Sequence, residues 1–262
     1  MTSCNRVVIR TFDTPFGTAC SANSTARASN ESTLAGDGTL FAIVGGVGDP
    51  EAASIASELS AGVLSQFTPV VASLRQSGVA AQDSPAHDFL RALLGECRNE
   101  MLRYIDKSSC EHGHLAIVAT MSLVVWPTVF TVHVGHNRVY HLSHRRLTQL
   151  TEDHTMAAKL VQAGVLSPRR ASASRLRNVV WNVVDNYSER IAPQFIETHL
   201  RPNDALVWCS AGVDQALGDC EIQRLLATSR SAAAACHNLV GSAANDDDVA
   251  IVARLGPVEP CR

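Results

Sequence analysis

Two predicted strand-to-helix corners are the places where chemistry is expected in this chain, and both contain almost no polar side chains. The apolar run Leu40–Val44 predicts a buried strand, followed by the glycine turn Gly45-Gly46-Val47-Gly48-Asp49 and a helix from about Glu51. The second corner, Trp208-Cys209-Ser210-Ala211-Gly212, carries an alanine in its turn. Such corners usually present polar groups to a ligand, so both look like sites for a carboxylate that is missing.

Two common chemistries are not expected at these corners. Gly46-Val47-Gly48 matches only the start of G-x-G-x-x-G, because Glu51 takes the third glycine position and would repel a pyrophosphate at a helix N-terminus. The sequence has no Gly-Lys-Ser/Thr run either. Ser210 does not lie in a G-x-S-x-G elbow, since Trp208 stands where the first glycine would be. Nucleotide binding and a nucleophilic serine are therefore disfavoured.

Metal-binding residue types occur in two further places. A transition metal needs about four converging ligands, and nothing supplies a third ligand to any of three histidine pairs, which we interpret as surface or core residues. These pairs are His112 with His114, His133 with His136, and His141 with His144. Asp246-Asp247-Asp248 precedes the last predicted strand, and this run fits either a solvated acidic turn or ligands for a hard cation.

The composition describes a folded protein without a polyanionic partner. Hydrophobic residues make up 46% of the 262 residues and charged residues 18%, which is ample for a packed core. The net charge of −3 gives no footprint for nucleic acid, and no basic block indicates an anionic membrane surface. The densest basic stretch, Arg169-Arg170 with Arg175 and Arg177, is interpreted as a solvated face.

Two further features favour a cytoplasmic protein. Met1–Arg10 lacks the apolar core of a signal peptide, and no apolar run reaches the roughly 18 residues of a membrane span. The eight cysteines form no C-x-x-C pair, so we expect reduced thiols that mostly act as small apolar fillers.

The order of the predicted elements indicates an α+β fold. Apolar residues at helical spacing predict helices, and β-rich runs between turn residues predict strands, four of which form an antiparallel meander between residues 116 and 150. Because helices and antiparallel strands are segregated, we expect sheets packed between helix layers in one domain. The predicted helices are 52–67, 88–105, 155–163, 219–227 and 232–239, and the predicted strands are 7–12, 16–21, 40–44, 116–125, 129–134, 139–142, 147–150, 195–200, 205–209 and 249–255.

Several short motifs extend this pattern in collinear order over residues 16 to 255. Besides the two corners, they are Arg27-Ala28-Ser29-Asn30-Glu31-Ser32, Val134-Gly135-His136-Asn137-Arg138, Leu150-Thr151-Glu152-Asp153-His154, Leu160-Val161-Gln162-Ala163-Gly164-Val165-Leu166-Ser167-Pro168, Arg177-Asn178-Val179-Val180 and Asp247-Asp248-Val249-Ala250. Taken together, they resemble the metal-dependent protein phosphatase family (PPM, type 2C) in its compact bacterial form. The resemblance implies a single domain over residues 1–262 with a four-layer α-β-β-α sandwich, two antiparallel sheets between helix pairs.

The chain departs from the family at the positions that hold metal. In the family, the Asp of V-x-D-G-x-G-G bridges two Mg²⁺ or Mn²⁺ ions, and here it is Gly45; the metal-binding Asp of S-D-G is Ala211. Ser32 follows the metal-binding glutamate where the family has an acidic residue. Val47 is the fourth position of the metal site that we regard as degenerate, beside Ser32, Gly45 and Ala211. The family's G-T-T has become Gly113-His114-Leu115, and the aspartate of V-G-D-S-R has become His136.

Part of the family's site is retained. By the resemblance, Glu31, the backbone carbonyl of Gly46 and Asp247 are residual metal candidates, and Arg27 corresponds to the phosphate-holding arginine. Hard cations are held by carboxylate oxygens, and two ions a few ångströms apart need a bridging anion. We therefore expect no intact catalytic set and no cofactor beyond a weakly held single Mg²⁺ or Mn²⁺.

The function that follows is that of a catalytically inactive pseudophosphatase, a protein-interaction or regulatory module. Its expected partner is another protein, namely a phosphoprotein, a kinase or a phosphatase, with no nucleic acid and no membrane. The alternative is an active Mn/Mg-dependent protein Ser/Thr phosphatase with an atypical site built from Glu31, Asp247, Asp49 and Asp246. A third alternative is an unrelated binding activity of the histidine-rich strands.

Overall fold

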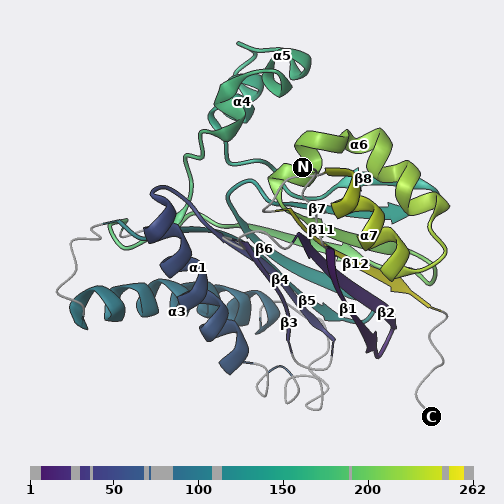
Figure 1. The fold of residues 1–262 in the computed structure, drawn as a ribbon, viewed down its shortest axis with the longest axis horizontal. Helices are drawn as coiled ribbons and strands as arrows, with labels where there is room; N and C mark the ends of the chain where they lie inside the picture. The colour runs from purple at the N-terminus through teal and green to yellow at the C-terminus, as the bar shows by residue number, and fades with distance from the viewer. Residues whose placement is uncertain are drawn as a thin grey trace, which may run out of the picture.

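The computed structural model describes residues 7–24, 30–35, 38–67, 71, 85–107, 114–188, 191–243 and 248–256. Two antiparallel sheets lie face to face, with one pair of helices on each outer side, as Figure 1 shows. The predicted α-β-β-α sandwich is therefore confirmed.

Each sheet joins strands that are distant in the sequence. The first sheet has the order β1 (Val7–Thr14), β2 (Gly17–Ser24), β12 (Val249–Leu255), β11 (Ala205–Cys209), β7 (Arg138–Ser143) and β8 (Arg146–Gln149). The second sheet has the order β10 (Gln194–His199), β6 (Thr128–Val134), β5 (Ala116–Val125), β4 (Leu40–Gly46) and β3 (Asn30–Ala35), with the short β9 (Val184–Asp185) paired to β5.

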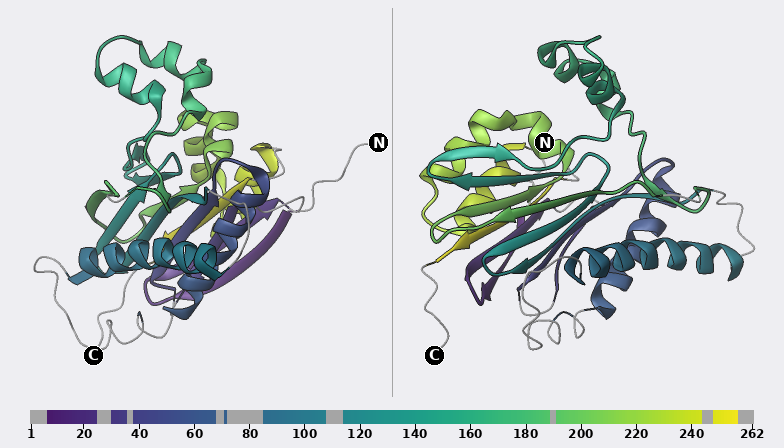
Figure 2. Two further views of the ribbon diagram at one scale, coloured as in Figure 1. Left: turned by 90° about the vertical axis from the view of Figure 1, so that its left-hand side faces the viewer. Right: turned by 180° about the vertical axis from the view of Figure 1, so that it is seen from behind.

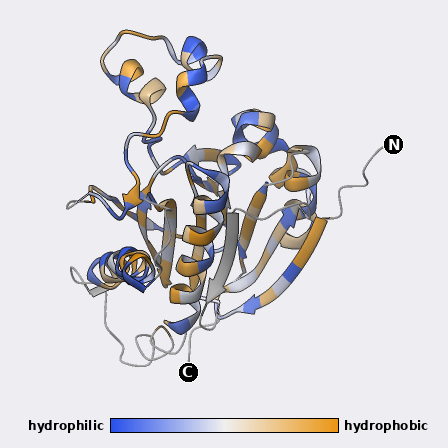
Figure 3. Ribbon diagram, turned by 60° about the vertical axis from the view of Figure 1, so that its left-hand side comes forward, coloured by the Kyte–Doolittle hydropathy of each residue, from blue (hydrophilic) through white to orange (hydrophobic). Residues whose placement is uncertain are grey.

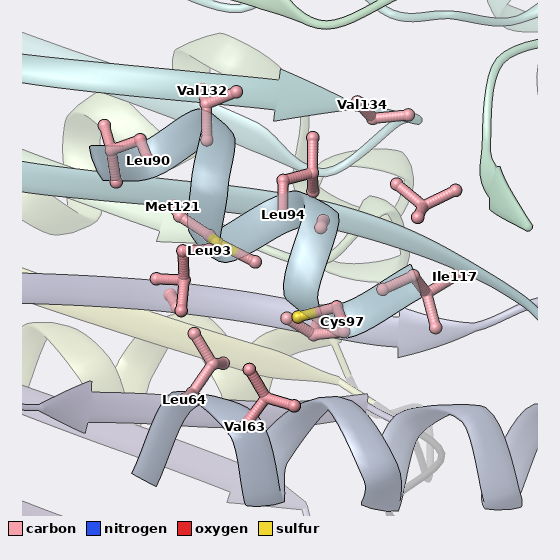
Figure 4. Packing of buried hydrophobic residues seen from close by; sticks show 14 of the residues in the cluster. Val63, Leu64, Leu90, Leu93, Leu94, Cys97, Ile117, Met121, Val132 and Val134 are labelled. Atoms are coloured by element: carbon pink, nitrogen blue, oxygen red, sulfur yellow. The ribbon is translucent and has the colours of Figure 1, made fainter. Parts of the chain in front are cut away.

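The outer helices cover the two sheets through separate apolar cores. Helices α1 (Pro50–Gln66) and α3 (Pro85–Lys107) lie on the second sheet, where Val63, Leu64 and Leu93 pack toward Met121 and Val132 (Figure 4). Helices α6 (Ala211–Thr228) and α7 (Ala232–Ala243) cover the first sheet through a second cluster of buried residues. Full burial of each large apolar side chain contributes about 1.5–3 kcal/mol, so these two layers hold the helices in place.

A third core fills the space between the sheets. Phe41 of β4 stacks on Trp208 of β11, with ring centroids 4.6 Å apart and an interplanar angle of 15°. Trp208 is fully buried, and its indole Nε1 donates a hydrogen bond to Ser122 Oγ over 2.8 Å. Because Trp208 thus finds a partner for its polar atom on the opposite sheet, it joins the two sheets in a fixed position.

Most predicted elements are present, but the structure differs from the expectations at several points. Gly45 and Gly46 belong to strand β4 and not to a turn, since they pair with Val118 and Ile117 of β5. Helix α6 begins at Ala211 and is divided by the non-helical Gly218 (φ 69°); its second part agrees with the predicted helix 219–227, whereas its first part was not predicted. The predicted meander is divided between the sheets: β5 and β6 lie in the second, whereas β7 and β8 lie in the first.

One segment stands apart from the layers. Residues 155–182, hereafter the projecting segment, contain α4 (Met156–Gln162), α5 (Pro168–Ser172) and a 3₁₀ turn (Arg175–Asn178), and they extend beyond the sandwich in Figures 1 and 2. Backbone hydrogen bonds from Met156 N to Val179 O (2.9 Å) and from Trp181 N to His154 O (3.0 Å) close its base. Helix α4 ends near Gly164 as predicted, whereas α5 and the 3₁₀ turn lie where an irregular stretch was expected.

None of the helices within the described ranges has both the length and the apolar character needed to cross a membrane.

Candidate functional site

The two corners predicted to be chemically empty lie close together. Asn137, in the turn between β6 and β7, is buried, and its Nδ2 donates to the carbonyl of Ile43 over 3.4 Å. Arg138, the next residue, pairs with Cys209 at the end of β11. The end of β4 and the beginning of α6 are thus brought to the same end of the space between the sheets.

Gly45 and Gly46 face opposite layers, as the two-residue period of a strand requires. Phe41 and Ile43 of β4 point between the sheets, so Gly45 offers only a hydrogen atom to that space. Gly46 faces α1 instead: a Cβ built there would lie 2.5 Å from Ala53 Cα and closer still to the Ala53 carbonyl. The glycine at position 46 is therefore required by the close approach of helix α1, whether or not a metal is present.

Asp49 has a structural role in this corner. Its Oδ1 accepts hydrogen bonds from the backbone N–H of Glu51 (3.0 Å) and Ala52 (3.3 Å), which makes it the N-cap of α1. Such a cap stabilises a helix by about 1 kcal/mol. The carboxylate that follows the glycines is thus oriented toward the helix terminus.

The second corner presents a methyl group. Ala211 is the first residue of α6, and Ser210 before it ties the helix to β12, because Ser210 N donates to Val249 O (3.0 Å) and Ser210 Oγ accepts from Val249 N (3.1 Å). Ala211 lines a pocket of about 800 Å³ between the projecting segment, β7–β8 and α6. No carboxylate reaches the pocket from position 211.

Other predicted site residues are only partly covered by the structure. Arg27, Asp246 and Asp247 lie outside the described residues, and Glu31 and Ser32 are placed in β3 by their backbone alone. Val47 donates its N–H to Ala116 O over 3.0 Å. Their proposed roles stay predictions. Among the described residues, no group of three or more His, Cys, Asp or Glu side chains could hold a metal ion.

An ion-pair network around Arg138 forms the charged wall of the pocket. The Arg138 guanidinium donates to both carboxylate oxygens of Asp153, with Nε to Oδ1 at 2.9 Å and Nη2 to Oδ2 at 2.6 Å, and its Nη1 donates to Asp214 Oδ1. The Tyr140 hydroxyl lies within hydrogen-bond distance of Asp214 (2.8 Å) and Asp219 (2.9 Å). Burial raises the pKa of Asp214, although Arg138 opposes this effect.

This network was not predicted as a unit. Arg138 and Asp153 each stand in a motif that carries the family resemblance, and these motifs were the signal that the sequence offered. Asp214 has no such signal, because helix α6 had not been predicted at that position. Since the guanidinium is bound on both forks by carboxylates of its own chain, it is not free to bind a phosphate.

The histidines lie in three separate environments. His133 is fully buried: its Nδ1 pairs with Thr120 Oγ1 (2.8 Å), its Nε2 lies 3.0 Å from Glu152 O, and burial lowers its pKa to about 3. His136 lines the pocket with a buried Nδ1 that finds no hydrogen-bond partner among the described residues, and burial lowers the pKa of this histidine. His141 Nε2 contacts Asp204 Oδ2 at 2.8 Å. The described histidines thus fit the interpretation as core and surface residues.

Sequence comparisons find bacterial protein phosphatases. No protein-family model matches the chain. It is 22% identical over 192 residues to the Listeria monocytogenes "Serine/threonine phosphatase stp", which covers 73% of each chain. It is 26% identical over 195 residues to "Serine/threonine protein phosphatase PstP" of Mycobacterium tuberculosis, which covers 74% of this chain but 35% of PstP. "Protein phosphatase PhpP" of Streptococcus pneumoniae is 23% identical over 209 residues, 79% of this chain and 80% of PhpP.

Solved structures show the same fold. The M. tuberculosis phosphatase PstP/Ppp superposes with a TM-score of 0.75 at 20% identity and covers 96% of this chain and 98% of its own. Stp1 of Staphylococcus aureus gives a TM-score of 0.75 at 19% identity, with 97% and 95% covered. The catalytic domain of PstP with two manganese ions gives 0.71 at 22% identity, with 95% and 99% covered.

The class of protein follows from the fold and these relatives. The chain has the α+β fold of the PPM phosphatases, with two antiparallel sheets and flanking helices. In sequence it is similar to bacterial Ser/Thr protein phosphatases such as PstP and the Listeria stp, at 22–26% identity.

The described residues at the two corners do not fit the two manganese ions that PstP was solved with. Position 45 supplies a hydrogen atom, position 211 supplies a methyl group, and the Asp49 carboxylate caps α1. Mn²⁺ and Mg²⁺ prefer oxygen ligands, and the described side chains at positions 45 and 211 offer no oxygen to such ions.

Proposed function

We propose that this chain is a catalytically inactive homologue of the PPM phosphatases that acts as a protein-interaction or regulatory module. The observation that carries the proposal is the orientation of β4: Gly45, which aligns with the family's bridging aspartate, faces the space between the sheets with no side chain. The methyl group of Ala211 at the second corner supports the same conclusion.

The energetic argument rests on charge. At an effective dielectric constant of ~20, a carboxylate about 4 Å from a cation contributes roughly 4 kcal/mol per unit of cation charge. The family alignment leaves two of four ligand carboxylates, and the bridging one is among those lost. Metal affinity should therefore fall by many orders of magnitude, and without metal ions no water is acidified to attack a phosphoryl group.

The residual groups still allow a weaker role. Glu31, Asp247 and the Gly46 carbonyl would hold at most a single Mg²⁺ or Mn²⁺, and Arg27 would contact a phosphate without a metal. The partner we propose is a phosphoprotein, a kinase or a phosphatase.

The second candidate is an active Mn/Mg-dependent Ser/Thr phosphatase with an atypical site. It is favoured by the names of the relatives, which are serine/threonine phosphatases or protein phosphatases throughout. Such an enzyme would depend on Glu31, Asp246 and Asp247. The role of Asp49 as a helix cap speaks against its recruitment as a ligand.

Two measurements on the same protein separate the candidates. Manganese affinity is measured by calorimetry, and turnover of p-nitrophenyl phosphate is measured in millimolar Mn²⁺. We expect no turnover and at most millimolar metal affinity in the unmodified chain, and at least a hundredfold gain in affinity when Gly45→Asp and Ala211→Asp are combined. Turnover by the unmodified chain that disappears in Asp247→Ala would establish the enzyme instead.

A further inference from the structure

The projecting segment concentrates positive charge. Residues 155–182 contain five basic side chains and no acidic one. The remainder of the chain holds 17 basic and 25 acidic residues, so it carries a net charge of −8 while the whole chain carries −3. The basic residues are Lys159, Arg169, Arg170, Arg175 and Arg177.

Three of the four arginines of this segment are exposed, and Arg177 is half-buried. Arg169, Arg170 and Arg175 are all exposed, and Arg177 donates from Nη1 to the Ser172 carbonyl over 2.9 Å. Within the described part of the chain, none of these four arginines pairs with a carboxylate.

Several arginines elsewhere in the fold pair with carboxylates. Arg103 pairs with two glutamates of α3, Arg138 pairs with Asp153 and Asp214, and Arg224 pairs with Glu221. Arg145, Arg146, Arg201 and Arg230 are exposed as well, so exposure alone does not set the projecting segment apart; the concentration of five basic residues without an acidic one does.

Apolar side chains accompany these arginines. Val165 is 65% exposed, Leu176 37%, Val179 46% and Trp181 41%, and all four belong to the projecting segment. Figure 3 shows hydrophobic and hydrophilic residues side by side on this part of the chain. Lys159 lies over the Trp181 ring, with Nζ 3.6 Å from its centroid. Exposed Trp and Arg beside aliphatic side chains have the composition of protein-binding hot spots.

We propose that the projecting segment is a docking surface for an acidic segment of a partner protein, rich in Asp and Glu and carrying some apolar side chains. This inference rests on the proposed function for the existence of a partner. Guanidinium groups bind carboxylates through paired N–H groups, and the apolar residues supply the desolvated contacts beside them.

A protein segment fits this surface better than a long polyanion. Within the projecting segment no acidic residue offsets the basic ones, whereas the net charge of −8 on the remaining chain would repel a nucleic acid or an anionic membrane that extends beyond it. At physiological ionic strength this repulsion acts within about 8 Å, so a short peptide bound to the projection escapes most of it.

Docking on this surface does not require the pocket. Arg177 lines the pocket together with Glu152 and Asp153, whereas Arg169, Arg170 and Arg175 do not line it. The three arginines are therefore available to a partner that stays outside the acidic wall of the pocket. For this reason, the docking surface can be tested independently of metal binding and turnover.

The test uses the full chain and a fluorescent 12-residue peptide of Asp, Glu and Leu. The test variant combines Arg169→Gln, Arg170→Gln, Arg175→Gln and Arg177→Gln. The control variant removes the same charge from exposed arginines elsewhere through Arg145→Gln, Arg146→Gln, Arg201→Gln and Arg230→Gln. We expect at least a tenfold loss of affinity in the test variant, less than a twofold loss in the control, and weaker binding at higher salt.

A second variant tests the apolar part of the surface. Val165→Ser with Val179→Ser keeps every charge and should weaken peptide binding about threefold. Melting temperatures of all variants show whether they are folded. The proposal is overturned if the acidic peptide does not bind, if test and control variants lose affinity equally, or if a single-stranded RNA or phosphatidylserine vesicles bind more tightly through the same arginines. Phosphatase turnover, measured in parallel, decides the proposed function separately.

Discussion

Replacement of Gly46 by alanine tests the packing that determines the first corner. The new Cβ would lie 2.5 Å from Ala53 Cα and closer to the carbonyl carbon and oxygen, whereas real Cβ contacts below 3.0 Å essentially never occur. The clashing atoms are helix backbone, so a side-chain rotation cannot relieve the overlap. Helix α1 would have to move by about 1 Å or more to restore ordinary contacts.

The size of the effect follows from what α1 buries. Displacement of the helix would disturb the contacts of Ala56, Val63 and Leu64, all of which are buried against the second sheet. Overpacking alone typically costs 1–3 kcal/mol, and the disturbed core adds to it, so we expect about 4 kcal/mol of destabilisation. In a protein of this size that corresponds to a decrease in Tm of roughly 8–16 °C.

Gly62→Ala is the matched control for this measurement. Gly62 lies in α1 itself, and a Cβ there would meet nothing within 4 Å. Because alanine favours an open helical position, the control should be stabilised by about 0.5–1 kcal/mol. Thermal unfolding followed by circular dichroism measures both variants. If the Gly46→Ala protein melts within about 3 °C of the parent, helix α1 does not approach β4 as closely as described here.

Two other variants test single residues of the site region. Asp49→Ala removes the N-cap of α1, so it should lower the free energy of unfolding by about 1 kcal/mol in urea titrations. Manganese affinity should stay unchanged. A loss of metal binding would instead assign Asp49 to a metal site. Burial lowers the pKa of His133 from 6.5 in the unfolded chain to about 3 in the folded chain. The free energy of unfolding therefore falls as the pH decreases from 6.5 to about 3, because only the unfolded chain binds the proton there. The slope approaches 1.4 kcal/mol per pH unit, and His133→Asn should flatten it; equal slopes in both proteins would contradict a buried neutral imidazole.

The sequence pattern was sufficient for most of the layers. Residues 88–105 were recognised as a helix because Phe89, Leu93, Met101 and Ile105 recur at helical spacing, and α3 extends only a few residues further at each end. Strand β12 has the predicted bounds because its apolar run is short and ends near Pro257. Such local periodicity reflects burial of one face, which the sequence records directly.

Elements at the glycines were not predictable in the same way. Gly45 and Gly46 resembled a turn because glycine is conformationally permissive, yet pairing with β5 keeps them extended. In each case the decision depends on neighbours that are distant in the sequence, which a local pattern does not contain.

The sequence by itself determined which atoms the two corners offer, because no fold can give Gly45 or Ala211 a carboxylate. It also determined the charge of the projecting segment, which depends only on the residue types between positions 155 and 182. Only the tertiary structure decided where these features lie. It turns Gly45 toward the space between the sheets and engages Asp49 as a helix cap. It also pairs Arg138 with Asp153 and Asp214, and it leaves most arginines of the projecting segment exposed. The physical reason is that orientation and pairing arise from contacts between segments far apart in the chain, whereas chemical type is fixed residue by residue.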